Sequence, residues 1–557
     1  MTRTIRALLL AGGVAALWAA TPVAAPPPER TPKLVVLLMV DQFRADYVER
    51  FHAQWTQGLK RLITEGAWFR QASYPYANTV TCAGHASVST GTFPATHGLI
   101  LNSWWDRDSS ATVTCTADRS VTNLGYGRAV SGGDSLASLR TTTLADELRA
   151  QLSPASHSVA FSLKARAAAP LGGRHPDAVA WFDDSGSWVT STAFTAALVP
   201  QVRDYIAEHP VQQDFGKRWE RTLPADSYLF EAPAIGVTAP EGMSATFPHL
   251  LNGSGSGAVD PLFYQQWQSS PFSDEYLARM ALDVATRLHF ESIGSTNLLG
   301  ISFSALDKVG HDYGPNSHEI QDVLIRLDRT LGELFAGLDR LVGPGRYTVA
   351  LTADHGVAPI PERAVAEGLP AGRVDTSLVV ATMESALTKA FGPGPHIAQY
   401  VHTEVYLRPG LAEEVASDPR IVASLNEAVR SVPGVDGVLV GKLLENLSGA
   451  SASQSAAFAR SYVAGRSGDL TVIYRPYWID DKTGTSHGTP NDYDTRVPLF
   501  LFGKGIAAGE YLNTASPTDV APTLAFLAGI TLPHTDGRVL TEALTSDIHP
   551  ARTSSAR

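Results

Sequence analysis

The hydrophobic pattern of the chain alternates between two kinds of segment. Short, continuous apolar runs favour strands that are buried on both faces, which is typical of a parallel sheet beneath helices. Between these runs, apolar residues recur with helical spacing, as at Val323, Leu327, Leu331 and Leu334 within residues 320–341. The alternation predicts an α/β fold, with a mainly parallel sheet flanked by helices on both faces. The predicted strands are residues 34–40, 158–163, 297–303, 347–352 and 497–502.

Two regions interrupt this alternation. One is rich in Trp, Pro and Gly, and the other contains mixed elements. We interpret both as inserted cap regions over the carboxyl-terminal edge of the sheet, where they would shape a pocket. The chain then divides into a signal peptide at 1–25, core segments at 26–187, 273–358 and 467–557, and insertions at 188–272 and 359–466.

The amino-terminal segment has the pattern of a secretory signal. Arg3 and Arg6 precede an apolar stretch over residues 7–20, and small residues follow as far as Ala25. An uncleaved anchor is the alternative, but the apolar stretch is too short to span a bilayer comfortably. No later segment reaches eighteen apolar residues, so we expect an exported mature chain without a membrane span, in the periplasm or outside the cell.

Composition and charge narrow the function classes. The 557 residues are 44% hydrophobic, which is enough for a large core, and the net charge is −11. The chain has no cluster of Lys and Arg, so nucleic acid and anionic membrane are not expected as main partners. An acidic protein that acts on an anion needs local positive charge, which metal ions can supply. The two cysteines, Cys82 and Cys115, leave one disulfide or two free thiols as open alternatives.

Acidic residues follow several of the predicted strands. Asp41 follows the first strand, Asp307 follows the third, and Asp354 with His355 follows the fourth. Open α/β sheets bind ligands at the carboxyl ends of their strands. Gly356 would break the strand there, so that the adjacent Asp354 and His355 can face one site.

Two more histidines complete a set of metal-ligand types. His311 follows Asp307 in the motif DKVGH, and His487 lies in a loop near the carboxyl terminus. Three carboxylates and three imidazoles without thiolates suit zinc or a similar divalent ion, and they are enough for two ions. Taken singly, each residue could instead cap a helix or lie exposed in a loop.

Thr81 opens a short helical run after the turn at residues 74–76. A helix amino terminus favours an anion, so a hydroxyl at this place suits a phosphorylated intermediate. The alternative is that Thr81 simply caps the helix.

The order of these motifs resembles the alkaline phosphatase superfamily, which includes nucleotide pyrophosphatases/phosphodiesterases and sulfatases. The pattern runs through nearly all of the mature chain. The resemblance implies two zinc ions. One would be held by Asp41, Asp354, His355 and the Thr81 oxygen, and the other by Asp307, His311 and His487.

The stretch SLKARAA at residues 162–168 is similar to the Lys-x-Arg element of phosphate-irrepressible alkaline phosphatases, whose nucleophile is threonine. This resemblance implies that Lys164, Arg166 and Asn102 bind the phosphoryl oxygens and that Thr81 forms a phosphothreonine. Two fixed cations favour a monoester, which carries one more charged oxygen than a diester. The implied function is a secreted phosphate monoesterase with a broad substrate range.

Three alternatives differ in what they require. A phosphodiesterase or nucleotide pyrophosphatase would share the metal ligands and the threonine, without needing the Lys–Arg pair. A sulfatase would need a cysteine followed by x-Pro-Ser-Arg, whereas Cys82 is followed by Ala83, Gly84 and His85. A catalytically silent binding protein would lack a ligand, and here every ligand type is present.

Overall fold

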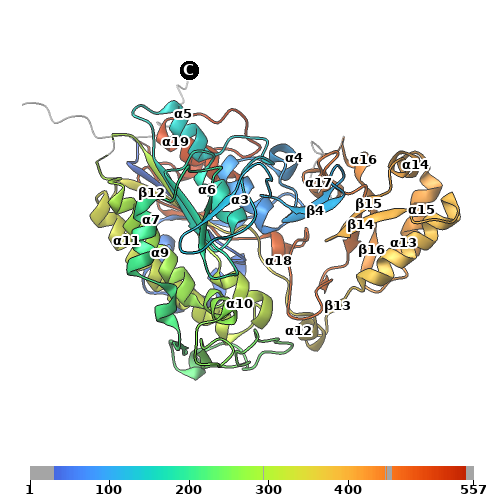
Figure 1. Ribbon diagram of the computed structural model, residues 1–557, viewed down its shortest axis with the longest axis horizontal. Coiled ribbons are helices and arrows are strands. Elements are labelled where there is room, and N and C mark those ends of the chain that lie inside the picture. The colour runs from blue at the N-terminus through green and yellow to red at the C-terminus, as the bar shows by residue number, and fades with distance from the viewer. Residues whose placement is uncertain (1–30, 293, 446, 448–453, 547–557) are drawn as a thin grey trace, which may run out of the picture. The chain divides into compact units, whose positions relative to one another are not determined.

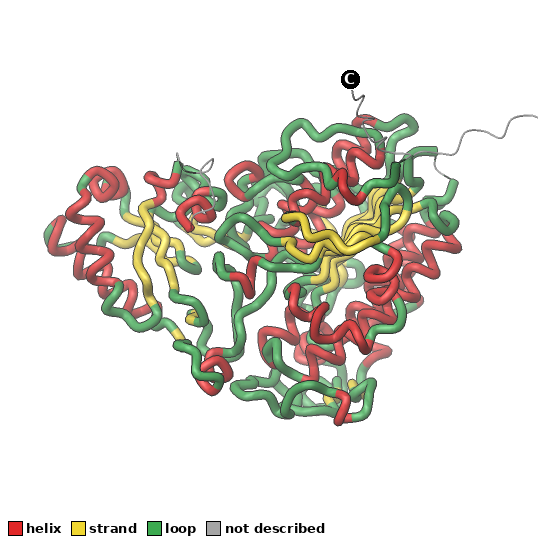
Figure 2. Tube along the Cα trace, turned by 180° about the vertical axis from the view of Figure 1, so that it is seen from behind, coloured by secondary structure: helices red, strands yellow, loops and turns green. Residues whose placement is uncertain are grey.

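The fold is centred on one large sheet, seen in a computed structural model that describes residues 31–292, 294–445, 447 and 454–546. The predicted signal peptide, residues 1–25, lies outside the described residues. Figure 2 shows the strands side by side with helices on both sides, as the sequence predicts. In order across the sheet, the strands are β20 (Gly509–Ala515), β2 (Ala67–Ala72), β19 (Leu499–Gly503), β12 (Tyr347–Thr352), β1 (Leu34–Val40), β11 (Asn297–Phe303), β6 (Ser158–Ser162), β7 (Ala178–Phe182), β8 (Trp188–Ser191) and β5 (Asn123–Gly125).

The centre of the sheet is parallel and its flanks are mixed. β1 pairs in parallel with β11 and β12, and β11 pairs in parallel with β6. β19 runs antiparallel to both of its neighbours, β12 and β2. The apolar pattern cannot reveal this direction, because a strand buried on both faces has the same composition in either orientation.

β1 explains why the central strands are apolar throughout. Its side chains alternate between two cores, with Leu34, Val36 and Leu38 on one side and Val35 and Leu37 on the other. One core is covered by α1 (Ala45–Phe51), α2 (Gly58–Glu65), α9 (Pro271–Arg287) and α11 (His318–Leu341). The other is covered by α5 (Leu144–Gln151), α6 (Ala165–Gly172) and α19 (Val520–Ala528).

A second, four-stranded antiparallel sheet contains β14 (Ile397–Val401), β15 (Glu404–Leu407), β17 (Leu470–Tyr474) and β16 (Val435–Val440) in that order. It has its own apolar core with α13 (Thr376–Phe391) and α15 (Pro419–Val429), which lie beside it in Figure 1. Both sheets belong to one compact unit, Thr31–Arg557. The division of the chain into core segments and insertions stays a prediction.

Shorter elements connect these layers. No helix among the described residues is long and apolar enough to cross a bilayer. The other elements are α3 (Thr81–Thr90), α4 (Pro94–His97), β3 (Ser103–Asp106), β4 (Ala111–Thr114), α7 (Pro200–Glu208), β9 (Arg218–Trp219), β10 (His249–Leu250), α8 (Pro261–Gln268), α10 (Ala305–Tyr313), α12 (Pro361–Ala366), β13 (Gly372–Arg373), α14 (Leu411–Ser417), α16 (Gly441–Leu444), α17 (Gln454–Ala459), β18 (Trp478–Ile479) and α18 (Asp492–Thr495).

Helix α3 packs directly against the end of β12 at Gly84, and this contact gives a testable prediction. A Cβ at Gly84 would lie 2.5 Å from the backbone oxygen of Asp354. We therefore expect Gly84→Ala to lower the free energy of unfolding by about 1–3 kcal/mol, as overpacking does. Gly294→Ala is the control, since its Cβ would be 3.6 Å from the nearest atom, in Pro154. Equal thermal unfolding midpoints for the two variants would contradict the prediction.

Candidate active site

Three carboxylates meet at the carboxyl ends of three adjacent strands, as predicted. Asp41 directly follows β1, Asp354 follows β12, and Asp307 lies in the first turn of α10, after β11. Their exposed fractions are 0%, 0% and 4%. Because β12, β1 and β11 are neighbours in the sheet, the chain brings these groups into one buried space.

The first group of candidate metal ligands is Asp307, His311 and His487, whose ligand atoms all lie within 4.8 Å of one another. His311 follows Asp307 by one turn of α10, so both project from the same face. The Nδ1 atoms of His311 and His487 lie 2.8 Å from the Thr485 carbonyl and 2.9 Å from the Thr79 carbonyl. Each Nδ1 can therefore donate a hydrogen bond, which leaves both Nε2 atoms as potential ligands.

The second group of candidate metal ligands is Asp41, His85 and Asp354. His85, from the middle of α3, was not among the ligands expected from the sequence. His85 uses both ring nitrogens, because Nδ1 lies 2.9 Å from the Thr81 carbonyl and Nε2 lies 2.9 Å from Ser302 Oγ. It therefore serves better as a support between the carboxylates than as a ligand.

His355 has the better properties of a ligand. Its Nδ1 lies 2.9 Å from the Gly356 carbonyl, and its Nε2 lies 3.2 Å from Asp354 Oδ2. Both Nε2 and Asp354 Oδ2 are buried without a hydrogen-bond partner among the described residues. Buried polar atoms of this kind are costly unless something binds them, so the donor set fits a divalent cation.

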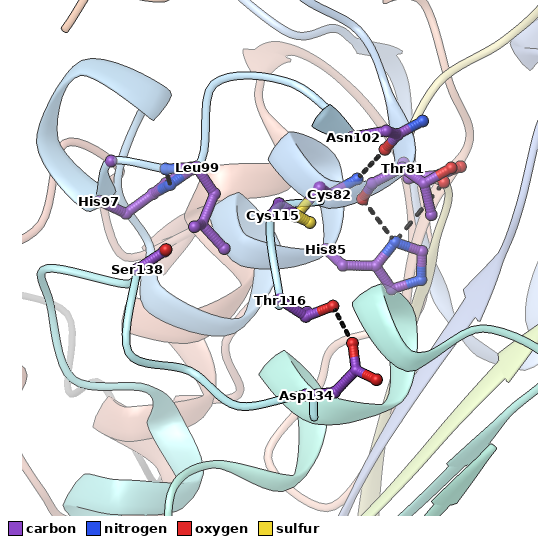
Figure 3. Close-up of a disulfide and its surroundings, with 12 residues drawn as sticks. Thr81, Cys82, His85, His97, Leu99, Asn102, Cys115, Thr116, Asp134 and Ser138 are labelled. Atoms are coloured by element: carbon purple, nitrogen blue, oxygen red, sulfur yellow. Dashed lines mark hydrogen bonds and ion pairs between the residues drawn. A yellow bond between two sulfur atoms is a disulfide. The ribbon is translucent and has the colours of Figure 1, made fainter. Parts of the chain in front are cut away.

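Thr81 is the first residue of α3 and is 1% exposed. The helix cap is Val80, so the alternative that Thr81 serves as the cap is wrong. The Asn102 Oδ1 atom accepts a hydrogen bond from the Cys82 N–H at 2.9 Å. Figure 3 shows the Asn102 oxygen facing Cys82, while its amide nitrogen points away, which leaves that nitrogen free to donate.

Lys164 lies between the two groups of ligands. The side chain is 7% exposed, and Nζ donates to Asp41 Oδ2 at 2.7 Å and to Asp307 Oδ2 at 2.6 Å. Burial lowers the pKa of the Lys164 ammonium, but Asp307 and Asp41 outweigh burial and raise it above its usual value. The Nε atom of Arg166, two residues on in α6, is buried without a partner in the described part of the chain. The alternative that Lys164 faces solvent does not hold, and Arg166 is partly buried.

Ionisation of the site follows from these contacts. Burial raises the pKa of the Asp307 carboxyl, but Lys164 and His311 lower it well below its usual range. For the His487 imidazole, burial has the opposite effect and lowers the pKa well below its usual value. At neutral pH the carboxylate is therefore charged and His487 is neutral, which are the forms that bind a metal.

Several residues that hold the site carboxylates in place could not be recognised from the sequence. Gln42 has a positive φ of 66°. Its backbone N–H donates to Asp354 Oδ1 at 3.1 Å, and its side-chain amide donates to Asp307 Oδ1 at 2.8 Å. Ser302 and Ser304 donate to the two oxygens of Asp41 at 2.9 and 3.0 Å. The only signal for the serines is their polarity at the end of an apolar strand.

Asp494 joins the loops that carry His355 and His487. Its carboxylate accepts from the Thr489 N–H at 2.9 Å and the Thr489 hydroxyl at 2.6 Å, while its carbonyl accepts from the Gly356 N–H at 2.7 Å. Burial raises the pKa of the Asp494 carboxyl to about 7. Nothing in the local sequence identified Asp494, because its contacts are made across the fold.

The second sheet reaches this region through the turn between β14 and β15. His402 lies in that turn with a positive φ of 58°. A Cβ at Gly488, the residue after His487, would lie 2.7 Å from His402 Nε2, and the φ of +108° there also favours glycine. The β14–β15 turn therefore limits the space beside the His487 loop.

Comparisons with known proteins find relatives that fit a phosphatase site of this kind. The model of the type I phosphodiesterase / nucleotide pyrophosphatase family matches residues 35–489. Alkaline phosphatase PhoV of Synechococcus elongatus is 31% identical over 525 residues, which cover 92% of this chain and 93% of PhoV. Alkaline phosphatase PafA of Elizabethkingia meningoseptica is 32% identical over 527 residues, which cover 92% of this chain and 94% of PafA.

A solved structure extends this likeness to the fold. The crystal structure of wild-type PafA matches with a TM-score of 0.83 at 30% identity, covering 94% of this chain and all of that one. Another PafA structure, with a TM-score of 0.84 at 29% identity, carries substitutions at a threonine, an asparagine, a lysine and an arginine. Those four have the same spacing along the chain as Thr81, Asn102, Lys164 and Arg166. The chain belongs to the type I phosphodiesterase / nucleotide pyrophosphatase family, in the alkaline phosphatase branch of the alkaline phosphatase superfamily.

Proposed function

We propose that the chain is an exported phosphate monoesterase that holds two zinc ions and reacts through a phosphothreonine at Thr81. One observation carries the proposal: Lys164 bridges two groups of carboxylate and imidazole ligands, and the Thr81 carbonyl contacts His85 in the second group. The alkaline phosphatases PhoV and PafA, which are similar over most of their length, support a phosphatase. A broad range of monoesters is part of the proposal.

Each group of side chains has a distinct role in the proposed mechanism. Asp307, His311 and His487 would hold one ion, and Asp41, Asp354 and His355, with the Thr81 oxygen, would hold the other. When bound, the ions would lower the pKa of the Thr81 hydroxyl and neutralise charge on the leaving oxygen.

The chain's own residues then carry out the transfer. Thr81 Oγ forms a bond to phosphorus as the bond to the leaving alcohol oxygen breaks on the opposite side. The Asn102 amide, Lys164 and Arg166 would stabilise the three remaining phosphoryl oxygens. Water then attacks the phosphothreonine, which releases phosphate and restores the Thr81 hydroxyl.

Export is the expected context for this enzyme. The signal-like segment at residues 1–25 supports it, and so does the disulfide between Cys82 and Cys115, since disulfides persist in the periplasm and outside the cell.

Thr81→Ala should abolish monoester hydrolysis, because no other group replaces the nucleophile. We expect kcat/KM to fall by at least about 10³-fold, as for other lost nucleophiles. The measurement is steady-state hydrolysis of an aryl phosphate, with acid-quenched protein assayed for phosphothreonine. Thr90→Ser, at the other end of the same helix, is the control. A phosphoenzyme that still forms in Thr81→Ala would rule out this nucleophile.

Lys164→Ala and Arg166→Ala should separate the monoesterase from the phosphodiesterase. Each cation should matter more for a dianionic monoester than for a monoanionic diester. We expect either substitution to lower kcat/KM for an aryl phosphate by about 10–100-fold and to change its methyl diester much less. Equal losses on both substrates, or a wild-type enzyme that prefers the diester, would favour the phosphodiesterase alternative.

Removal of metal should abolish turnover and reduce stability. Without cations, the buried carboxylates Asp41, Asp307 and Asp354 repel one another, so chelation should lower the thermal unfolding midpoint. Zinc should restore both properties, and elemental analysis should give two zinc atoms per chain. The Asp307→Asn variant should bind one zinc atom fewer. Full activity after exhaustive chelation would refute the metal assignment.

A further inference from the structure

The disulfide between Cys82 and Cys115 lies directly beside the nucleophile. Cys82 follows Thr81 in the first turn of α3, and Cys115 directly follows β4. The two residues are 0% and 1% exposed. The bond therefore ties the start of α3 to the end of the β3–β4 hairpin, and Figure 3 shows the two joined cysteines beside Thr81.

Asn102 is held between the two cysteines. Its side-chain oxygen accepts from the Cys82 N–H at 2.9 Å, and its backbone oxygen accepts from the Cys115 N–H at 3.0 Å. Together, the two hydrogen bonds and the disulfide link Cys82, Asn102 and Cys115 to one another. The orientation of the Asn102 amide is thus fixed at both its side chain and its backbone.

This arrangement matters because a phosphoryl-binding group must be placed accurately. A displacement of about 1 Å in such a group can cost roughly 10²-fold in rate. The Cys82 N–H is one of the donors that a helix start leaves unpaired, and it is used here to orient Asn102 rather than to bind the anion. The hairpin is also attached elsewhere, since Arg107 donates to Gly465 O and to Asp469, but these contacts do not reach Asn102.

We propose that the Cys82–Cys115 disulfide is a positioning device for phosphoryl transfer: it holds the Asn102 amide nitrogen at the fixed distance from Thr81 that the transition state requires. The inference rests on the proposed monoesterase function. It assigns the bond a role in the rate of the reaction as well as in the stability of the fold.

The test is a double-mutant cycle between the disulfide and Asn102. The paired substitution Cys82→Ala with Cys115→Ala is made in the wild type and in Asn102→Ala. The readouts are kcat and KM for an aryl phosphate and the inhibition constant of inorganic phosphate. In the wild type, we expect loss of the disulfide to lower kcat/KM about tenfold and to weaken phosphate inhibition. In the Asn102→Ala background the same loss should change neither constant by more than about twofold.

A matched control separates positioning from general loosening of the hairpin. Thr116 lies next to Cys115 and donates to Asp134 Oδ1 at 2.5 Å, away from Asn102 (Figure 3). Thr116→Val should lower the unfolding midpoint while kcat/KM stays within about twofold of wild type. If the double alanine variant folds poorly, Cys82→Val with Cys115→Ala restores apolar volume and takes its place.

The outcomes are distinct. Equal losses in the two backgrounds, or wild-type constants without the disulfide, would overturn the positioning role and leave the monoesterase intact. A wild-type protein that hydrolyses no phosphate monoester would overturn the proposed function and this inference with it.

Discussion

Mutual repulsion among buried carboxylates is the constraint on which the rest of the site depends. Asp41, Asp307 and Asp354 are at most 4% exposed and share one end of the sheet. Like charges in a space of low polarity are strongly unfavourable unless cations and hydrogen-bond donors compensate them. Lys164 supplies one cation to two of them, and Gln42 donates to Asp307 and Asp354. The surrounding structure is arranged to meet this requirement.

A second feature is that several site residues are held by a residue from another part of the chain. His487 is oriented by the Thr79 carbonyl, and Asn102 by the Cys82 N–H. Asp494 ties together the loops on which His355 and His487 lie. Preorganised groups of this kind need little rearrangement during the reaction. Most of the effect of electrostatic catalysis comes from this preorganisation.

The sequence was informative where local chemistry decides structure. The apolar runs predicted β1, β11 and β12 with their bounds, because a strand buried on both faces needs no other signal. The acids after those strands could be found by the rule that places ligands at strand ends. His85 could not, because it lies within a helix and joins the site only through contacts with Ser302 and Asp354, which are far from it in the sequence. The direction of β19, the formation of the disulfide and the contacts of Asp494 likewise depend on distant contacts.

The balance of charge also bears on which ester fits the site. With the imidazoles neutral, as metal binding requires, the three carboxylates outweigh Lys164 and Arg166 by one negative charge, which cations must offset before a phosphate can bind. One divalent ion would leave a single positive charge, and two would leave three. A dianionic monoester together with an ionised Thr81 oxygen carries three negative charges, whereas a diester in the same position carries two. Neutralisation within a buried site is worth more than in water, so two ions with a monoester would be the matched combination.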